Sequence, residues 1–368
     1  MRLENTEACR ARVKLALVRG IQRTRLIALL ESAGAPERLF LNARKSLSEM
    51  TSSEVSALNQ NLSRDTDAQI ALGGRVQAEV LAYSDDRYPE LLKHIQCPPI
   101  VLFARGDSRA LVGTAVAIVG SRKCSPTGRR VAERFGRGLA AAGVIVVSGL
   151  ARGIDSQAHL GALAGGGRTV AVLGSGVDVC YPRENRGLSE EILKTGVVVS
   201  EFPFGAPPLR QHFPLRNRII SGVCRGVVVV EAGEGSGALV TASHALEQGR
   251  DVFVIPGDTT ISSTVGSNRL LKEGARPVTE VRDVLQALAP GLSDGHELPV
   301  EASGHALELS EEEEAILEYI SHIPTHVDEV CEQVGLEAQS VLPVLLSLEI
   351  KGLVRQEPGN KFVRLVET

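Results

Sequence analysis

The pattern of apolar positions changes twice along the chain of 368 residues and divides it into three parts. In residues 1–70, apolar side chains recur at helical spacing, as between Leu15 and Leu30, and the run stops at Gly34 with Pro36 just beyond. Apolar residues three and four positions apart, followed by glycine and proline, are typical of helices and their C-terminal ends. We therefore predict a small N-terminal helical domain over residues 1–70.

The middle of the chain alternates short β-branched runs with helical stretches. The runs are Val116–Val119, Val144–Val147, Thr169–Leu173, Val197–Ser200, Val227–Glu231 and Asp251–Ile255. Continuous apolar strands that alternate with helices form a parallel sheet covered on both faces. We predict an α/β fold class over residues 80–290, with an extended Rossmann-like, doubly wound parallel sheet. The pattern loosens over residues 71–111, which the prolines there predict to be extended connecting chain.

The last part of the chain returns to helical spacing. Residues 291–308 are rich in glycine, proline and serine, which predicts a linker. After it, Ser310 precedes four glutamates, as at the start of a helix. Three helical stretches and two alternating runs around Pro358-Gly359-Asn360 follow. Three helices and a β-hairpin predict a winged-helix-like domain over residues 309–368.

The net charge of −4 is unevenly distributed along the chain. Residues 1–70 carry a net charge of +3, residues 305–368 carry −9, and the remainder carries +2. Because salt screens a charge beyond about 10 Å, local patches rather than the total charge decide phosphate affinity. The acidic winged helix would repel phosphate, which favours a protein-contact or regulatory module over a DNA reader.

The six cysteines are scattered and include no C-x-x-C pair, so neither a disulfide framework nor a zinc ribbon is indicated. We expect free, mostly buried thiols in a reducing compartment and no metal site. The start of the chain lacks the apolar core of a signal peptide, and no apolar run approaches the roughly 18 residues of a membrane span. These features predict a cytoplasmic protein without a membrane span.

Glycine-rich turns follow four of the predicted strands. They are Gly120-Ser121-Arg122, Ser148-Gly149-Leu150-Ala151-Arg152, Gly174-Ser175-Gly176 and Gly233-Glu234-Gly235-Ser236-Gly237. In an open parallel sheet, ligands bind outside the carboxyl ends of the strands, where helix N-termini present free N–H groups. Glycine lets a phosphate approach the backbone, and arginine adds a charge-assisted fork. Tight packing alone also requires glycine in such turns, but four on one sheet edge favour a phosphate-bearing ligand.

A cationic segment with one aromatic residue, Arg210 to Arg218, narrows the type of ligand. Arginine for phosphate beside an aromatic ring for stacking is typical of single-stranded nucleic acid binding. An equally good interpretation places Phe213 in the core and pairs Arg216 and Arg218 with Glu201 or Glu231. The predicted single-stranded-DNA contacts are Gly120, Ser121, Arg122, Ser148, Gly149, Arg152, Arg210, Phe213, Arg216, Asn217, Ser236 and Gly237.

Several longer motifs occur in one order over roughly residues 80–280. They are Gly120-Ser121-Arg122, Ser148 to Asp155 with Ala158-His159, Tyr181-Pro182, Phe213-Pro-Leu-Arg-Asn-Arg-Ile-Ile220, Glu231-Ala232, Ser236-Gly-Ala-Leu239 and Pro256-Gly257. In these motifs the chain resembles the DprA (Smf) family of DNA-processing proteins of natural transformation. The two end domains resemble variable additions in that family, a SAM or helix-hairpin-helix-like domain and a winged helix.

The resemblance implies a protein that binds single-stranded DNA, shields it from nucleases and loads RecA during natural transformation and recombination. It also implies displacement of single-strand-binding protein and a homodimer formed through the Rossmann-like domain. On matching positions, the Gly120-Ser121-Arg122 turn and Arg210 would contact phosphate, and Phe213 would stack on a base.

The enzymatic alternative is a Rossmann-like hydrolase of a phosphate-bearing small molecule. Asp155 and His159 are four residues apart, and Glu201 and Glu231 end strands at the ligand edge. Asp155 is equally well explained as a helix N-cap that pairs with His159. The first turn is not G-x-G-x-x-G, and the chain lacks G-x-x-x-x-G-K-[ST], so neither a nicotinamide cofactor nor an ATPase is indicated. We predict a binding protein without enzymatic activity or cofactor.

Overall fold

The computed structural model describes most of the chain: residues 6–41, 50–59, 63–288, 310–321, 323–351, 353–357 and 359–365. The chain divides into two compact units, Met1–Leu298 and Pro299–Thr368. The predicted linker over residues 291–308 lies outside the described residues.

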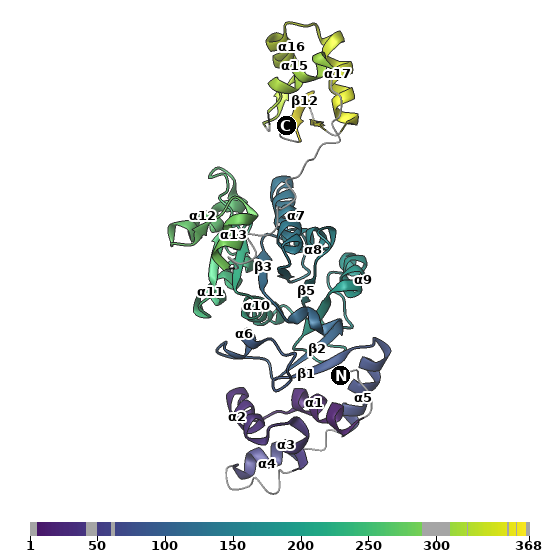
Figure 1. The fold of residues 1–368 in the computed structure, drawn as a ribbon, viewed down its shortest axis with the longest axis vertical. Helices are drawn as coiled ribbons and strands as arrows, with labels where there is room; N and C mark the ends of the chain where they lie inside the picture. The colour runs from purple at the N-terminus through teal and green to yellow at the C-terminus, as the bar shows by residue number, and fades with distance from the viewer. Residues whose placement is uncertain are drawn as a thin grey trace. The chain divides into compact units, whose positions relative to one another are not determined.

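The first unit contains a sheet of nine strands, counted over the described residues, in the order β1-β2-β6-β5-β4-β3-β7-β8-β9 (Figure 1). Seven neighbouring strands are parallel: β6 (Val197–Ser200), β5 (Thr169–Val172), β4 (Ile145–Ser148), β3 (Ala115–Val119), β7 (Gly226–Val229), β8 (Asp251–Val254) and β9 (Arg276–Pro277). All but the short β9 coincide with the predicted apolar runs. The parallel α/β sheet is therefore confirmed.

Two further strands extend one edge of the sheet in a segment that was predicted to be connecting chain. They are β1 (Glu79–Ala82) and β2 (Val101–Gly106), which pair with each other and, through β2, antiparallel to β6. The prediction for residues 71–111 was wrong because each strand is short and the prolines lie in the loop between them. The pairing of β2 with β6 joins residues about a hundred positions apart, which local pattern cannot show.

Helices cover both faces of the sheet. One face carries α7 (Pro126–Ala141), α8 (Ile154–Ala164), α9 (Arg186–Thr195) and α13 (Val281–Leu288). The other carries α6 (Glu90–Lys93), α10 (His212–Gly222), α11 (Gly237–Glu247) and α12 (Val265–Lys272). In Figure 1, α9 lies to the right of β3 and β5, and α11 lies to the left. The doubly wound arrangement is therefore confirmed.

Both faces of the sheet are buried because successive side chains of each strand point to opposite faces. Ala117 and Val119 of β3 face one helical layer, while Val116 and Ile118 face the other. Three short 3-10 helices connect elements: η1 (Ser108–Leu111), η2 (Arg183–Asn185) and η3 (Ser262–Thr264).

The described N-terminal residues form five helices that belong to the same unit as the sheet. They are α1 (Glu7–Leu17), α2 (Arg23–Ala33), α3 (Pro36–Leu41), α4 (Ser52–Leu58) and α5 (Ser63–Arg75). Helix α2 ends at Gly34, whose φ of 75° is left-handed, as the sequence predicted. A further helix, α3, starts at Pro36. The helices share a core with Val80 of β1 and Phe103 of β2. The sheet edge and the N-terminal helices thus stabilise each other.

The second unit has three helices and a three-stranded sheet, counted over its described residues. These are α15 (Glu311–Tyr319), α16 (Val327–Val334), α17 (Ala338–Ile350), β10 (Thr325–His326), β11 (Val354–Glu357) and β12 (Lys361–Arg364), with β12 in the centre. Ser310 caps α15 in a capping box with Glu313. The β11–β12 hairpin turns at Gly359 and Asn360, both at positive φ. The predicted winged helix is confirmed.

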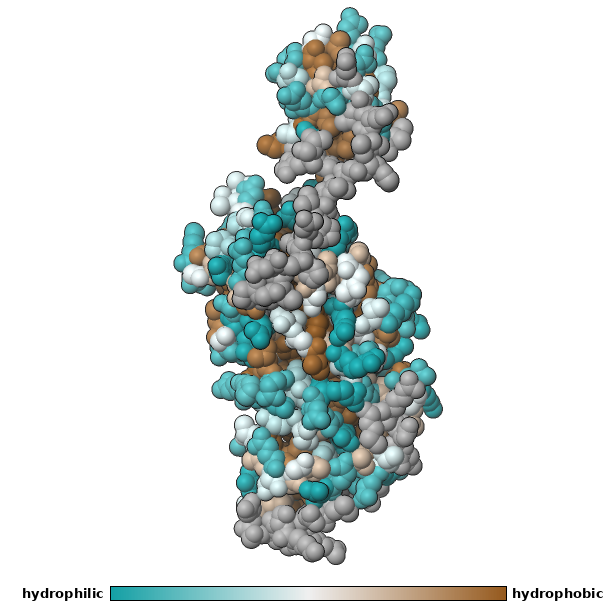
Figure 2. Space-filling view, in the orientation of Figure 1, coloured by the Kyte–Doolittle hydropathy of each residue, from teal (hydrophilic) through white to brown (hydrophobic). Residues whose placement is uncertain are grey.

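None of the six cysteines, all of which the structure describes, forms a disulfide, but only Cys9 and Cys224 are buried, so the expectation of mostly buried thiols was wrong. No described helix is long and apolar enough to cross a bilayer. The surface seen in Figure 2 is mixed, with small apolar areas between polar ones. In the first unit, exposed large apolar side chains occur on α11 and around the start of α12: Val240, Leu246, Ile261 and Val265.

Candidate nucleic-acid interface

A hollow of about 790 Å³ opens at the carboxyl ends of the parallel strands. Its walls are the turn after β3, the turn after β7 with the start of α11, and α10 with the residue Arg210 that precedes it. We call it the sheet-edge hollow. It brings together residues from three of the four predicted glycine turns, those after β3, β4 and β7, and from the predicted cationic segment that starts at Arg210. Parallel strands have this effect because their carboxyl ends meet at one edge of the sheet.

Three cations line this hollow without a carboxylate partner. Arg122, Lys123 and Arg210 are all exposed, and none forms an ion pair within the described part of the chain. Glu234 is an acidic side chain in the same lining, and it lies 3.9 Å from Arg269. Uncompensated cations in a concave site attract anions much more strongly than paired ones. The arrangement is suited to a phosphate-bearing ligand.

Phe213 lies in the same hollow, between a cation and a second aromatic ring. The Arg122 guanidinium carbon is 5.3 Å from the centre of its ring, and the Tyr181 ring is 5.6 Å away. Phe213 is half-buried and lines the hollow, so the alternative that placed it in the core is wrong. A partly exposed ring beside unpaired cations offers a flat apolar surface to a base.

Arg216 lies under this surface and is only 4% exposed. Its Nη1 donates to the carbonyl oxygen of Gly149 at 2.8 Å and to that of Val172. Burial lowers the pKa of Arg216 to about 10, while Asp155 acts in the opposite direction. Arg216 therefore fixes α10 to the ends of β4 and β5, and supports the hollow from below. It is not a surface contact of the kind that the sequence suggested.

Two of the glycine turns have their backbone donors engaged inside the protein. The amides of Ser121 and Ser125 donate to the backbone oxygen and the carboxylate of Glu231, and those of Gly149 and Ala151 donate to Asp155. These two turns were expected to cradle phosphate through their backbones. In the structure their amides instead donate to Glu231 and Asp155 and so hold the two loops in place.

The glycines of these two turns also have packing roles. A Cβ on Gly120 would lie 2.5 Å from Cγ1 of Ile154, and one on Gly149 would overlap the Arg216 guanidinium. Both positions require glycine for close packing. The tight-packing alternative for these two turns is therefore the better one.

The turn after β7 differs, because its glycines face open space. A Cβ on Gly235 or Gly237 would meet no atom within 4 Å. Their amides donate to no other group among the residues with described positions. Ser236 caps α11 by accepting from the amide of Ala238. Free amides at the start of a helix are able to bind an anion.

The remaining predicted residues have different positions. Asn217 and Ser236 line the hollow, and the Asn217 amide donates to the carbonyl of Gly237 at 3.1 Å. Arg152 is engaged by Glu184. Ser148 is fully buried and donates to the carbonyl of Ile118, so it does not reach the hollow.

The predicted contacts do not include Lys123 and Tyr181, whose side chains line the hollow. Lys123 directly follows the Gly120-Ser121-Arg122 turn, so its position beside that turn was a usable signal. Tyr181 belongs to one of the ordered motifs, but only the fold brings it to Phe213.

The carboxylates of the hydrolase alternative are engaged by protein donors. Asp155 is buried and accepts from two amides; it is not the N-cap of α8, which is Gly153. His159 bonds Thr169 at 2.7 Å instead of Asp155, and burial lowers the pKa of His159 to about 3. Glu231 is held by Ser125, and Glu201 pairs with Arg218 as one alternative expected. Of these four residues, only Asp155 is among those that line the sheet-edge hollow.

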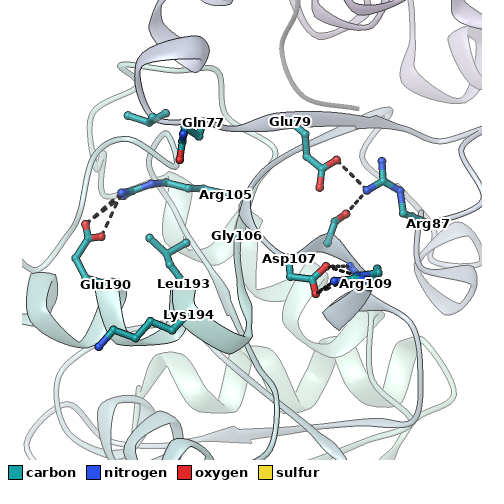
Figure 3. A pocket seen from close by; sticks show the side chains of 12 residues that line it. Gln77, Glu79, Arg87, Arg105, Gly106, Asp107, Arg109, Glu190, Leu193 and Lys194 are labelled. Carbon is teal, nitrogen blue, oxygen red and sulfur yellow. Dashed lines mark hydrogen bonds and ion pairs between the residues drawn. The ribbon is translucent and has the colours of Figure 1, made fainter.

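A second arginine-rich hollow, of about 830 Å³, lies beside α9 and the end of β2 (Figure 3). We call it the α9 hollow. Arg105 pairs with Glu190, Arg87 with Glu79 at 2.9 Å and Arg109 with Asp107 at 2.9 Å. In Figure 3 the two members of each pair point toward each other. The charges here are compensated within the protein.

The chain matches two family models. The model for DNA recombination-mediator protein A matches residues 79–289, more than half of the chain, and the model for the DprA winged helix domain matches residues 300–360. Among curated proteins, it is 47% identical over 201 residues to the DNA processing protein DprA of Streptococcus pneumoniae, covering 55% of this chain and 71% of that protein. It is 41% identical over 285 residues to protein Smf of Escherichia coli, covering 76% of this chain and 75% of that protein.

Two solved structures are similar. The X-ray structure of DNA processing protein A from Streptococcus pneumoniae has a TM-score of 0.65 and 36% identity, covering 77% of this chain and 99% of that one. DNA processing protein A from Helicobacter pylori has a TM-score of 0.53 and 28% identity, covering 58% and 97%; its structure is described as showing a unique single-stranded-DNA binding mode. These matches confirm the resemblance inferred from the motifs.

Proposed function

Because the chain belongs to the DNA recombination-mediator protein A (DprA/Smf) family, we propose that it binds single-stranded DNA in the sheet-edge hollow. One observation carries the proposal: Arg122, Lys123 and Arg210 are unpaired within the described residues and line the same hollow as the half-buried ring of Phe213, which Arg122 covers. Unpaired cations track a phosphate backbone, and an accessible ring stacks on unpaired bases. The description of the Helicobacter pylori relative supports the same type of ligand.

In this proposal the parts of the hollow have different tasks. Arg122, Lys123 and Arg210 neutralise phosphates, and the free amides of Gly235 and Gly237 donate to another phosphate oxygen. Phe213, with Tyr181 beside it, stacks on a base. Arg216 and Asn217 hold α10 so that Phe213 keeps its position. None of these contacts reads a base edge, so the binding is expected to depend little on sequence.

A titration of the full chain against labelled oligonucleotides tests the proposal. Anisotropy should show tighter binding to a single strand than to a duplex of the same length, because stacking on Phe213 needs unpaired bases. Affinity should fall steeply with salt. Equal affinity for single strand and duplex would contradict the proposed site.

We further propose the partners that the family resemblance implies: loading of RecA, displacement of single-strand-binding protein, and a homodimer formed through the Rossmann-like domain. We propose the cytoplasm as its location, because it would share that compartment with RecA. We also propose that the protein binds DNA without catalysing a reaction. RecA filament assembly on DNA coated with single-strand-binding protein tests the loading, and it should accelerate when this protein is added. Light scattering of the full chain tests the dimer, with Leu246→Asp as the variant because Leu246 is 58% exposed.

A further inference from the structure

The loop between β6 and α10, residues 201–211, is held in place by the N-terminal helices at two points. Nη1 of Arg23, on α2, donates to Oε2 of Glu201 at 3.2 Å. Gln69, on α5, exchanges two hydrogen bonds with the backbone of Phe204: its Nε2 donates to the carbonyl at 3.1 Å, and its Oε1 accepts from the amide at 2.8 Å. Two helices thus hold the first half of a loop whose second half carries Arg210.

Glu201 also connects this attachment to α10. Its carboxylate accepts from Nη2 of Arg218, and the side chains of Glu201 and Arg218 are 7% and 10% exposed. A carboxylate shared between two guanidinium groups transmits the position of α2 to the helix that begins next to Phe213. Removing Glu201 would leave Arg218 buried and unpaired, which is strongly destabilising. Arg23 and Gln69 are therefore the better positions to test.

The first half of the loop is also packed. Phe204 is 3% exposed, and its ring lies edge-on to Phe103 of β2 with centres 4.9 Å apart. The carboxylate of Asp178 accepts from the amide of Gly205 at 2.9 Å. Beyond this point Arg210 is exposed and forms no ion pair with any residue of described position. The position of Arg210 at the hollow is therefore set by the backbone of the loop residues that precede it.

We propose that Arg23 and Gln69 are positioning residues for DNA binding, through which the N-terminal helices pre-order the loop that bears Arg210. The inference rests on the proposed function of the sheet-edge hollow. A loop that is ordered before binding loses less conformational entropy when the ligand binds, so the affinity is higher without any contact between these residues and DNA.

The first test compares variants of the full chain in single-stranded-DNA titrations. Arg23→Gln combined with Gln69→Leu removes both attachments and should raise Kd by about 3- to 10-fold, the equivalent of one or two net hydrogen bonds. Gln69→Glu keeps the acceptor for the Phe204 amide and should have an intermediate effect. Arg25→Gln is the matched control, because it breaks a 2.9 Å pair with Glu54 that lies within the N-terminal helices. An equal loss in the control would overturn the proposal.

A double-mutant cycle separates positioning from general stabilisation. Arg210→Ala should weaken binding about tenfold in the native background but only two- to threefold when both attachments are removed, because Arg210 is then no longer pre-positioned. The same factor in both backgrounds would show that the two sites act independently, and the proposal would fail.

Hydrogen exchange of the free protein supplies a readout without DNA. In the variant lacking both attachments, peptides covering residues 201–211 should exchange faster, first at the Phe204 amide, which loses its acceptor, while those of β4 and β5 should not change. Unchanged exchange in the loop would overturn the inference even if the native chain binds DNA. Failure of the native chain to bind single-stranded DNA would instead remove the proposed function and leave the attachment to be decided by exchange.

Discussion

The two arginine-rich hollows of the first unit are similar in volume and differ in what their arginines bind. The sheet-edge hollow measures about 790 Å³ and the α9 hollow about 830 Å³. In the α9 hollow, Arg87, Arg105 and Arg109 each pair with a carboxylate (Figure 3). In the sheet-edge hollow, Arg122 and Arg210 pair with none that the structure describes. The number of arginines therefore does not distinguish a binding site from a structural one.

The difference lies in which interactions a ligand would have to replace. A phosphate entering the α9 hollow must compete with carboxylates already in place, whereas one entering the sheet-edge hollow displaces only water. The aromatic side chains follow the same division. Phe213 and Tyr181 line the sheet-edge hollow, while none of the residues found to line the α9 hollow is aromatic. Unpaired charge and an accessible ring occur together in only one of the two.

The strongest test of this comparison reverses charge in each hollow in turn. Arg122→Glu with Arg210→Glu should weaken single-stranded-DNA binding by at least about 100-fold near 0.15 M salt, and lower the salt slope by roughly 0.7 for each lost phosphate contact. Anisotropy titrations at several salt concentrations measure both quantities. Arg109→Glu makes the same charge change per site at the α9 hollow, on a side chain that is 80% exposed, and should leave the affinity nearly unchanged. Equal losses would mean that only net charge matters.

Removing the ring should have the next largest effect. Phe213→Ala is expected to cost about 1–3 kcal/mol of single-stranded-DNA affinity through lost stacking. Phe213→Tyr keeps the ring and serves as the control. Circular dichroism of both variants should match the native chain, because Phe213 is only half-buried. An unchanged affinity in Phe213→Ala would move base contact to another residue.

The sequence predicted the parallel sheet, the winged helix and most of the hollow because these depend on local patterns. Strand runs, the cap at Ser310 and the turn glycines are all visible in a few consecutive residues. The roles within the hollow depend on partners far apart in the chain, such as Arg216 with the Gly149 carbonyl or Arg152 with Glu184. No local pattern tells a paired arginine from an unpaired one, so Arg152 and Arg122 were predicted to be equivalent.

The glycine turns show the same limit. Gly149 and Gly237 both follow strands at the same edge, yet a side chain on the first would overlap the Arg216 guanidinium and one on the second would meet open space. Residue type alone therefore cannot separate packing from ligand approach. The edge strands β1 and β2 were missed for a related reason, since they join the sheet through the pairing of β2 with β6, which is formed between distant segments.

Arginine substitutions should affect different properties in the two hollows. Arg87→Gln breaks its pair with Glu79, which is partly screened because Arg87 is 39% exposed, so we expect a loss of about 1 kcal/mol of stability, or roughly 2–4 °C in Tm. Its DNA affinity should not change. Arg122→Gln should behave the other way, with weaker binding and a Tm within about 1 °C of the native value. Thermal unfolding and anisotropy on the same preparations of both variants measure Tm and DNA affinity. A loss of DNA affinity in Arg87→Gln would contradict the proposed difference between the two hollows.

The smallest expected effect comes from freeing an arginine in the α9 hollow. Glu190→Gln removes the carboxylate that Arg105 contacts at 3.2 Å and leaves a cation in a concave surface without an accessible ring beside it. A single phosphate contact changes the salt slope by only about 0.7, so we expect an affinity gain of no more than about twofold. The measurement is most sensitive in the Arg122→Glu and Arg210→Glu background, where binding by the sheet-edge hollow is suppressed. Recovery of most of the native affinity there would show that an unpaired arginine is sufficient, and that the ring of Phe213 and the free amides of Gly235 and Gly237 contribute little. Absence of recovery would show that the site needs all three kinds of group in one place.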